Sequence, residues 1–391
     1  MDNNFQSAFG NFHLQRRPPT PSQPLQAWDA ADEYLLEELA RNGFSGASSS
    51  ASPTLVINDQ FGALALALHA VQPHSWSDSC NAHLALATNY LDNHLANNVV
   101  LIPATQPPAL DRDTAQKYRG VKYRVVLWRI PKTLALFQQQ AAQLLSVVDQ
   151  STLILAGGMI KHLPEQAVDI FRQLGRVDIL HAQKKARLFK ITPQPDLPAA
   201  TSPTVKMLDI PEYALQLGAG VNVFARDKLD IGARFFIEQF DKLPTARSIA
   251  DLGCGNGVLG IIAKRLQPMS EISFFDESYQ AVTAAADNYR RNIGATLAPQ
   301  ANYYFDDCLS HYCGDPFDLI LCNPPFHQNH VTGDQIAWRM FTQSKNHLRS
   351  GGEFWIVGNR HLDYPLKLKR IFGNCRQIAA HPKFVVLAAK K

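Results

Sequence analysis

The sequence predicts an α/β protein built from two similar domains in tandem, each with a mostly parallel sheet covered by helices on both faces. Three observations support this prediction. The chain has 391 residues, which is more than one average domain needs. Each half alternates short apolar strands with helical stretches. The second half also repeats the pattern of the first.

The internal repeat is an ordered series of matched segments, displaced from one another by about 200 residues. A helical segment comes first, followed by an apolar strand that runs into a turn, and later by a strand that ends near a proline. Asp78 falls opposite Asp276 in this series, so we expect the first copy to keep that carboxylate. The main matches are 29–39 with 230–240, 54–64 with 248–260, 89–90 with 288–289, and 123–131 with 317–325. We interpret the series as a duplication.

A stretch rich in Pro, Ala, Ser and Thr at 192–204 is the predicted linker between the copies. It leaves a first domain at 1–191 and a second domain at 205–391. The opening segment through Pro24 is polar and is interrupted by four prolines. We expect it to be a loose or docked arm.

Composition narrows the possible classes of protein. The apolar runs are far shorter than the roughly 20 residues that cross a bilayer, and no signal segment opens the chain. Six cysteines are scattered without a Cys-x-x-Cys pair, which argues against a structural zinc or other metal site. We therefore expect a cytoplasmic protein that contacts no membrane. A formal charge of +4 neither requires nor excludes a nucleic-acid partner.

The segment Asp251-Leu-Gly-Cys-Gly-Asn-Gly257 lies between a predicted strand and an apolar helix. Its glycines, Gly253, Gly255 and Gly257, allow the chain to reverse and a ligand to approach bare backbone. The pattern differs from a phosphate-binding P-loop. The alternative is a tight strand-to-helix turn without a ligand.

Two further predicted strands end in acidic residues, at Asp276 and at Asp306-Asp307. Ligands of open α/β sheets bind at the carboxyl ends of the strands, where all these residues fall. A carboxylate at Asp276 could accept both hydroxyls of a ribose, and Asp307 lies where an adenine amino group could be bound. The alternative is that these acids only begin loops or cap helices.

Asn323-Pro324-Pro325-Phe326 follows a fourth apolar strand and suits chemistry on an amino group. An exocyclic amine on a base is a poor nucleophile because its lone pair is conjugated into the ring. The Asn323 side chain and the Pro324 backbone offer two carbonyl acceptors for its N–H groups, and the proline pair restricts φ. Phe326 offers a face on which a base can stack. The alternative is an ordinary proline turn.

Together these motifs resemble those of S-adenosylmethionine-dependent methyltransferases that modify amino groups. The resemblance implies two Rossmann-like domains, each with a seven-stranded sheet that ends in a reversed hairpin, here at 377–390. It also implies that Asp251 and the glycines hold the methionine part of the donor, Asp276 the ribose and Asp307 the adenine. NAD-linked dehydrogenases share the first strand and turn, but they do not explain Asn-Pro-Pro-Phe.

The first copy has lost these features. Asn58 and Gln60 stand in place of the first two glycines, and Arg129 replaces Asn323. We therefore predict that this degenerate copy neither binds the donor nor methylates. Its basic residues and interleaved aromatic residues suggest an RNA-binding platform, although a solvated charged face is the alternative. These residues are Arg112, Lys117, Arg119, Lys122, Arg124, Arg129 and Lys132 with Tyr118, Tyr123 and Trp128, and a second cluster at 184–190.

A degenerate first copy joined to an intact second copy resembles the bacterial ribosomal RNA guanine-N2 methyltransferases over nearly the whole chain. The resemblance includes the loop 222–230 with Arg226, which in that family folds over the donor. The segments 25–34 and 358–364 are more similar to the large-subunit (23S) enzyme. The resemblance implies methylation of guanine N2 in large-subunit rRNA. We expect the RNA to be naked or at an early stage of assembly, and the protein to be a monomer. A small-subunit rRNA enzyme, an adenine-N6 or protein-glutamine methyltransferase, and a non-enzymatic RNA-binding adaptor remain alternatives.

Overall fold

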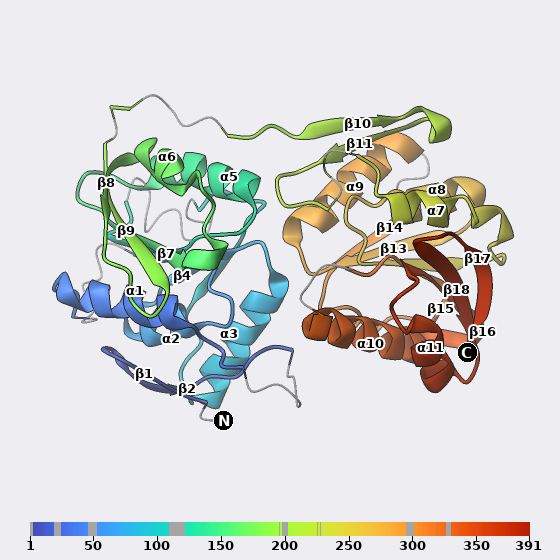
Figure 1. The fold of residues 1–391 in the computed structure, drawn as a ribbon, viewed down its shortest axis with the longest axis horizontal. Coiled ribbons are helices and arrows are strands. Elements are labelled where there is room, and N and C mark those ends of the chain that lie inside the picture. The colour runs from blue at the N-terminus through green and yellow to red at the C-terminus, as the bar shows by residue number, and fades with distance from the viewer. Residues whose placement is uncertain are drawn as a thin grey trace. The chain divides into compact units, whose positions relative to one another are not determined.

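The computed structural model describes residues 3–18, 25–45, 53–108, 122–194, 196–197, 202–224, 226, 228–294, 301–325 and 330–391, the last range without the side chains of 330–334. The chain divides into two compact units, Met1–Thr204 and Val205–Lys391. Each unit contains its own seven-stranded sheet (Figure 1). Within the described residues, no helix is long and apolar enough to cross a membrane.

The sheet of the second unit has the strand order β14-β13-β12-β15-β16-β18-β17. Its strands are β12 (Ser248–Leu252), β13 (Glu271–Asp276), β14 (Ala301–Phe305), β15 (Phe317–Cys322), β16 (Leu348–Asn359), β17 (Arg376–Ala380) and β18 (Phe384–Lys390). The first five are parallel, and β18 is antiparallel to both of its neighbours. The reversed terminal hairpin implied by the resemblance is therefore present.

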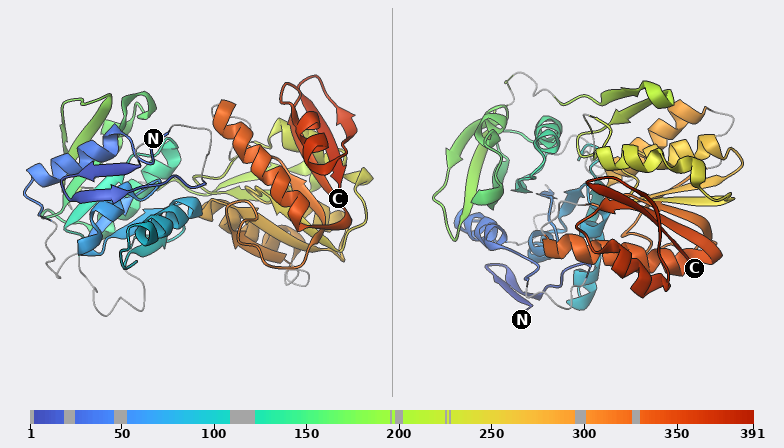
Figure 2. Two further views of the ribbon diagram at one scale, coloured as in Figure 1. Left: turned by 90° about the horizontal axis from the view of Figure 1, so that it is seen from below. Right: turned by 45° about the vertical axis from the view of Figure 1, so that its right-hand side comes forward.

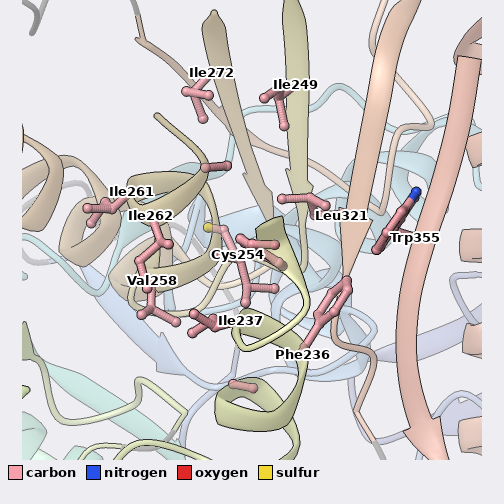
Figure 3. Packing of buried hydrophobic residues seen from close by; sticks show 14 of the residues in the cluster. Phe236, Ile237, Ile249, Cys254, Val258, Ile261, Ile262, Ile272, Leu321 and Trp355 are labelled. Atoms are coloured by element: carbon pink, nitrogen blue, oxygen red, sulfur yellow. The ribbon is translucent and has the colours of Figure 1, made fainter. Parts of the chain in front are cut away.

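Helices cover both faces of this sheet. They are α7 (Ile231–Ile237), α8 (Val258–Leu266), α9 (Tyr279–Ile293), α10 (His330–His347) and α11 (Tyr364–Phe372). Because successive strand residues point to opposite faces, Ile249 packs with α7–α9 while its neighbour Ala250 packs with α10 and α11. Figure 2 shows these two helix layers on either side of the sheet. Figure 3 shows residues of this core cluster, with Phe236 of α7 turned toward the strands that carry Leu321 and Trp355, and Val258 of α8 beside Ile237.

The first unit repeats this architecture, with the strand order β5-β4-β3-β6-β7-β9-β8. The strands are β3 (Thr54–Ile57), β4 (His74–Ser77), β5 (Val100–Pro103), β6 (Val125–Arg129), β7 (Leu153–Met159), β8 (Gly175–Ile179) and β9 (Ala186–Pro193). The helices are α1 (Ala30–Arg41), α2 (Ala63–Ala67), α3 (Cys80–Asp92), α5 (Leu134–Leu144) and α6 (Ala167–Arg172). α1–α3 pack on one face, and α5 and α6 on the other. The expectation of two tandem Rossmann-like domains is confirmed.

A short hairpin precedes each sheet and is clamped by an equivalent asparagine. The hairpins are β1 (Asn4–Ser7) with β2 (Gly10–His13), and β10 (Lys206–Ile210) with β11 (Leu215–Ala219). Asn288 of α9 accepts from the backbone N–H of Gly218 at 2.6 Å and donates to its carbonyl at 2.8 Å. Asn89 of α3 makes the same pair of bonds with Gln15, at 2.9 and 3.0 Å. The repeat therefore includes the hairpins, and the described part of the opening arm is docked.

The strand register corrects one match made from the sequence. The partners that set the register are Ile57 with Trp76 in the first unit and Leu252 with Phe275 in the second. Ser77, not Asp78, therefore occupies the place of Asp276. The hydrogen bonds agree, because Ser77 Oγ accepts from Ser79 N at 3.1 Å and Asp276 Oδ1 accepts from Ser278 N at 3.0 Å. The expectation that the first copy keeps this carboxylate is wrong.

Candidate active site

The candidate site residues gather at one edge of the second sheet. Leu252, the last residue of β12, pairs with Cys322, the last residue of β15. Gly253 and Asn323 therefore leave the sheet on adjacent strands, which are spaced by about 4.8 Å. β13 and β14 continue the same parallel edge, so Asp276 ends there too. The fold places the glycine turn, the acidic strand ends and the start of Asn-Pro-Pro along a single edge.

The glycine turn is pinned to the neighbouring strand by its backbone. The N–H groups of Gly253 and Cys254 both donate to the carbonyl of Phe275, at 2.8 and 2.9 Å. The N–H of Gly255 donates to Asp276 Oδ2 at 3.0 Å. The turn and the second-strand carboxylate are thereby held as one rigid unit.

Gly255 and Gly257 have different physical roles. Both have positive φ, +53° and +81°. A Cβ at Gly255 would meet nothing within 4 Å, whereas a Cβ at Gly257 would lie 2.9 Å from the Cβ of Ala285 on α9. Gly257 therefore allows α8 and α9 to pack closely, while Gly255 leaves open space above the turn.

The first unit provides an internal comparison for these glycines. It retains Gly62 at the place of Gly257, again with positive φ and with Leu86 Cδ1 only 2.7 Å from an added Cβ. It replaces the other two glycines with Asn58 and Gln60. The glycine needed for helix packing is common to both units, whereas Gly253 and Gly255, the latter with open space above it, are found only in the second.

Asp251 is fully buried within β12 and only half satisfied. Its Oδ2 accepts from Gly260 N at 2.9 Å, but Oδ1 has no hydrogen-bond partner among the described residues. Burial raises the pKa of this carboxyl to about 8. The equivalent residue of the first unit is Val56, and there Asp59 supplies the acceptor for Ala65 N, the counterpart of Gly260 N, at 2.8 Å. A buried acceptor without a partner costs free energy, which points to a ligand at this position.

Asp276 presents a carboxylate already oriented by backbone donors. Oδ1 accepts from Ser278 N and Oδ2 from Gly255 N, both at 3.0 Å. Burial raises the pKa of Asp276, and these backbone hydrogen bonds oppose the shift. Each carboxylate oxygen has a second lone pair, so the group can still accept from a diol.

The two acids that follow β14 both have side-chain partners, an ion pair for Asp307 and a hydrogen bond for Asp306. Arg339 of α10 contacts Asp307 Oδ1 at 2.6 Å, and His311 contacts Asp306 Oδ1, also at 2.6 Å. An adenine amino group bound by Asp307 must therefore share this carboxylate with Arg339. Sequence reasoning did not find Arg339, since nothing in the sequence of α10 marks it as the partner of a strand end.

Asn323 carries an unsatisfied acceptor. Its Oδ1 is buried and has no hydrogen-bond partner among the described residues, while Nδ2 lies 3.5 Å from Oδ2 of Asp230. Pro324 is buried and Pro325 is exposed. Phe326 lies outside the described residues. Arg226, in the loop before α7, is partly buried.

In the first unit, the side chains at the positions of Asn323 and Gly253 are bound to neighbouring side chains of the same unit. Arg129 contacts Asp29 with both guanidinium branches, at 2.7 and 2.8 Å, and Asp32 at 2.7 Å. Asn58 and Gln140 exchange two amide hydrogen bonds of 2.9 Å. This unit has Val56 at the position of Asp251 and Arg129, which offers no side-chain acceptor, at the position of Asn323.

The proposed RNA platform is only partly supported by the described residues. Tyr123 and Trp128 are 2% and 0% exposed, so the expectation that they stack on bases is wrong. Arg129 is held in the ion pairs described above. Lys122 and Arg124 remain near the surface. Arg112, Lys117, Tyr118 and Arg119 lie outside the described residues.

No group of three or more metal-ligating side chains occurs in the described part of the chain. The unpartnered oxygen of Asp251, the open space at Gly255 and the oriented Asp276 instead form a set of acceptors and bare backbone. Such a set suits an organic ligand with an ammonium group and a ribose.

Two family models match the chain, one in each unit. The "RLMG N-terminal domain" matches residues 2–195, and the "Methyltransferase small domain" matches residues 214–388.

The chain also has full-length relatives. It is 45% identical to "Ribosomal RNA large subunit methyltransferase G" of Stutzerimonas stutzeri, over 98% of each chain, and 43% identical to the protein of the same name from Ectopseudomonas mendocina, over 99% of each. Among solved structures, it is similar to a T. thermophilus 16S rRNA N2 G1207 methyltransferase in complex with AdoMet and guanosine. That similarity has a TM-score of 0.74 at 16% identity, covers 99% of this chain and 97% of that one, and shows a common fold.

Proposed function

Because the chain belongs to the ribosomal RNA large subunit methyltransferase G family, we propose that its second unit transfers a methyl group from S-adenosylmethionine to the exocyclic N2 of a guanine in 23S rRNA. The observation that carries the proposal is the buried Oδ1 of Asn323, which has no hydrogen-bond partner in the part of the chain that the structure describes. Asn323 follows β15, which is the direct neighbour of β12, the strand that leads into the glycine turn. An acceptor for an amine is thereby held beside the place for the methyl donor.

The second unit fits the donor. Asp251 offers to the ammonium group its Oδ1, which no described residue contacts by a hydrogen bond. Gly255 leaves space for the methionine chain, and Asp276 accepts from the ribose hydroxyls. Asp307, with Arg339, lies at the strand that the adenine would approach. Arg226 lies in the loop expected to fold over the donor. S-adenosylmethionine, when bound, supplies a methyl group activated by a positively charged sulfur.

The acceptor amine is activated by hydrogen bonding rather than by a base. Asn323 Oδ1 and the Pro324 carbonyl accept the two N–H groups, so the lone pair of the amine regains density on nitrogen. They also hold that nitrogen facing the methyl group, which supplies an orientation effect. Once methylated, the nitrogen is strongly acidic and loses a proton to water. Phe326 is proposed as the stacking surface for a base turned out of its RNA.

The first unit is proposed to bind RNA without binding the donor. The absence of donor binding is supported by two observations: Arg129 and Asn58 are already hydrogen-bonded within this unit, and Val56 stands at the position of Asp251. We further propose that the enzyme acts as a monomer on naked or early-assembly rRNA, where a base can leave its helix before ribosomal proteins cover it.

Substitution of Asn323 tests the proposal. We expect Asn323→Ala to lower kcat by about 100-fold, the usual effect of losing one pre-positioned polar contact, while the Kd for S-adenosylmethionine stays unchanged. Methyl transfer is measured with radiolabelled donor on 23S rRNA from a strain that lacks the gene, and the modified nucleotide is mapped.

A matched control is Asn292→Ala in the same unit. The Asn292 side chain holds the backbone of Gln216, at 2.7 and 3.0 Å, and donates to the Asn288 carbonyl at 2.8 Å. None of these groups belongs to the proposed site, so its loss should leave kcat unchanged. Wild-type turnover by Asn323→Ala, or labelling of protein rather than rRNA, would contradict the proposed function.

A further inference from the structure

The two ends of the Asn323 side chain are not equivalent for the proposed chemistry. Only the carbonyl end can accept a hydrogen bond from an attacking amine, whereas the NH2 end would oppose it. A side-chain amide has nearly the same shape in both orientations. Some neighbouring group must therefore decide which end faces the amine.

Asp230 is placed to make that choice. Its carboxylate Oδ2 lies 3.5 Å from Asn323 Nδ2, and a carboxylate accepts hydrogen bonds but does not donate them. The NH2 end is thus held toward Asp230, and Oδ1 is turned away, where it has no partner among the described residues.

The Asp230 carboxylate is itself fixed by the start of α7. Asp230 is the N-cap residue, and its Oδ2 accepts from Ala233 N at 2.9 Å. Gly232 leaves room for this arrangement. A Cβ there would lie 3.0 Å from Asp230 Oδ2 and 3.3 Å from the Phe384 ring.

The first unit holds the same pair of positions together. Asp29 caps α1 as Asp230 caps α7, and its carboxylate contacts Arg129 at the place of Asn323. In both units the capping aspartate therefore contacts the side chain at the carboxyl end of the fourth strand, Arg129 as the last residue of β6 and Asn323 just after β15. Among the described residues, only the second unit has at this position a side chain with an acceptor that lacks a partner.

We propose that Asp230 is a positioning residue that orients the Asn323 amide so that Oδ1 faces the substrate amine. This inference rests on the proposed function, since it assigns the control of the same acceptor. Asp230 acts through Asn323 and does not touch the guanine.

Two substitutions of Asp230 separate its capping role from its positioning role. Asp230→Ser keeps a hydroxyl that caps α7 but is too short to reach Asn323. We expect kcat to fall by about 10- to 100-fold, with the Kd for S-adenosylmethionine and the thermal midpoint unchanged. Asp230→Asn keeps an oxygen that can both cap the helix and accept from Asn323. It should restore kcat to within about threefold of the wild type.

A double substitution tests whether Asp230 acts through Asn323. In the Asn323→Ala background, Asp230→Ser should cause no further loss of kcat, because the amide that it orients is gone. Gly232→Ala provides a second route, since it retains Asp230 but displaces the carboxylate. We expect a several-fold loss of kcat from it as well.

The outcomes distinguish this inference from the proposed function. Wild-type kcat in Asp230→Ser or in Gly232→Ala, or losses that add in the double variant, would overturn the positioning role while leaving the function standing. Wild-type kcat in Asn323→Ala would overturn the proposed function itself.

Discussion

Gly255→Ala and Gly257→Ala add the same methyl group to the same turn, yet we expect them to act on different properties. Both residues have positive φ, where a Cβ costs about 1–2 kcal/mol. At Gly255 nothing lies within 4 Å of the added methyl, so this strain is the whole cost to folding. At Gly257 the methyl would lie 2.9 Å from Ala285 Cβ. Such overpacking adds about 1–3 kcal/mol.

The two variants should therefore separate donor binding from stability. Gly255→Ala should lower the free energy of unfolding of the second unit by about 1–2 kcal/mol. Its methyl enters the space proposed for the methionine chain. If overpacking against a ligand costs as much as overpacking in a core, the Kd for S-adenosylmethionine rises by about 10- to 100-fold. Gly257→Ala should instead lose about 2–5 kcal/mol of stability, with little change in the Kd of the folded protein.

Urea unfolding followed by tryptophan fluorescence gives the stabilities, and isothermal titration with S-adenosylmethionine gives the Kd. Gly62→Ala is the matched control, because it repeats the Gly257 clash in the first unit and should leave donor binding unchanged. An unaltered Kd in Gly255→Ala, or equal losses of stability in the two variants, would refute the reasoning.

Three other variants test separate parts of the structure. Burial raises the pKa of Asp251 to about 8, so the folded state holds a proton that the unfolded state has lost between about pH 4 and pH 8. As the pH rises through this window, the free energy of unfolding of the wild type should therefore fall by about 1.4 kcal/mol per pH unit relative to that of Asp251→Asn. Urea unfolding of both proteins at pH 5 and pH 7 measures this, and an equal change in the two proteins would contradict the prediction. Arg129→Met should lower the free energy of unfolding of the first unit by about 3–5 kcal/mol, because it leaves the buried Asp32 carboxylate without its cationic partner. It should not change the Kd for S-adenosylmethionine. A loss below about 1 kcal/mol in thermal unfolding would show that the ion pair is dispensable. Lys184→Glu with Lys185→Glu removes two exposed cations and should flatten the plot of log K for RNA against log salt by about 0.9 per lost phosphate contact; an unchanged slope argues against this face as part of the platform.

The order of the elements could be predicted from the sequence because both copies keep the same succession of apolar strands and amphipathic helices. The match of Asp78 to Asp276 failed because it relied on residue type near the end of a strand. The strand register and the shared cap bond placed Ser77 there instead. A shift of one residue is invisible in a sequence comparison, but it decides whether a carboxylate is present.

Side-chain contacts between distant segments were also beyond the reach of the sequence. From the sequence, Tyr123 and Trp128 were predicted to stack on bases. They lie beside and on β6, and both side chains are buried in the core of the first unit. The contacts of Arg339 with Asp307 and of Asp230 with Asn323 join positions far apart in the chain, and no local pattern marks them. The glycine turn was predictable as a motif, whereas the packing role of Gly257 required the position of Ala285.

The asparagine clamps determine where this chain can be divided. Asn288 needs Gly218, and Asn89 needs Gln15, so each hairpin travels with the sheet that follows it. Proteolysis or gene splitting after Thr204 leaves both pairs intact. A fragment trimmed to begin at Val221 would instead leave the buried Asn288 amide without Gly218 and uncover the flank of α9. Because both units share this clamp, we infer that a duplicated module would have carried its own hairpin.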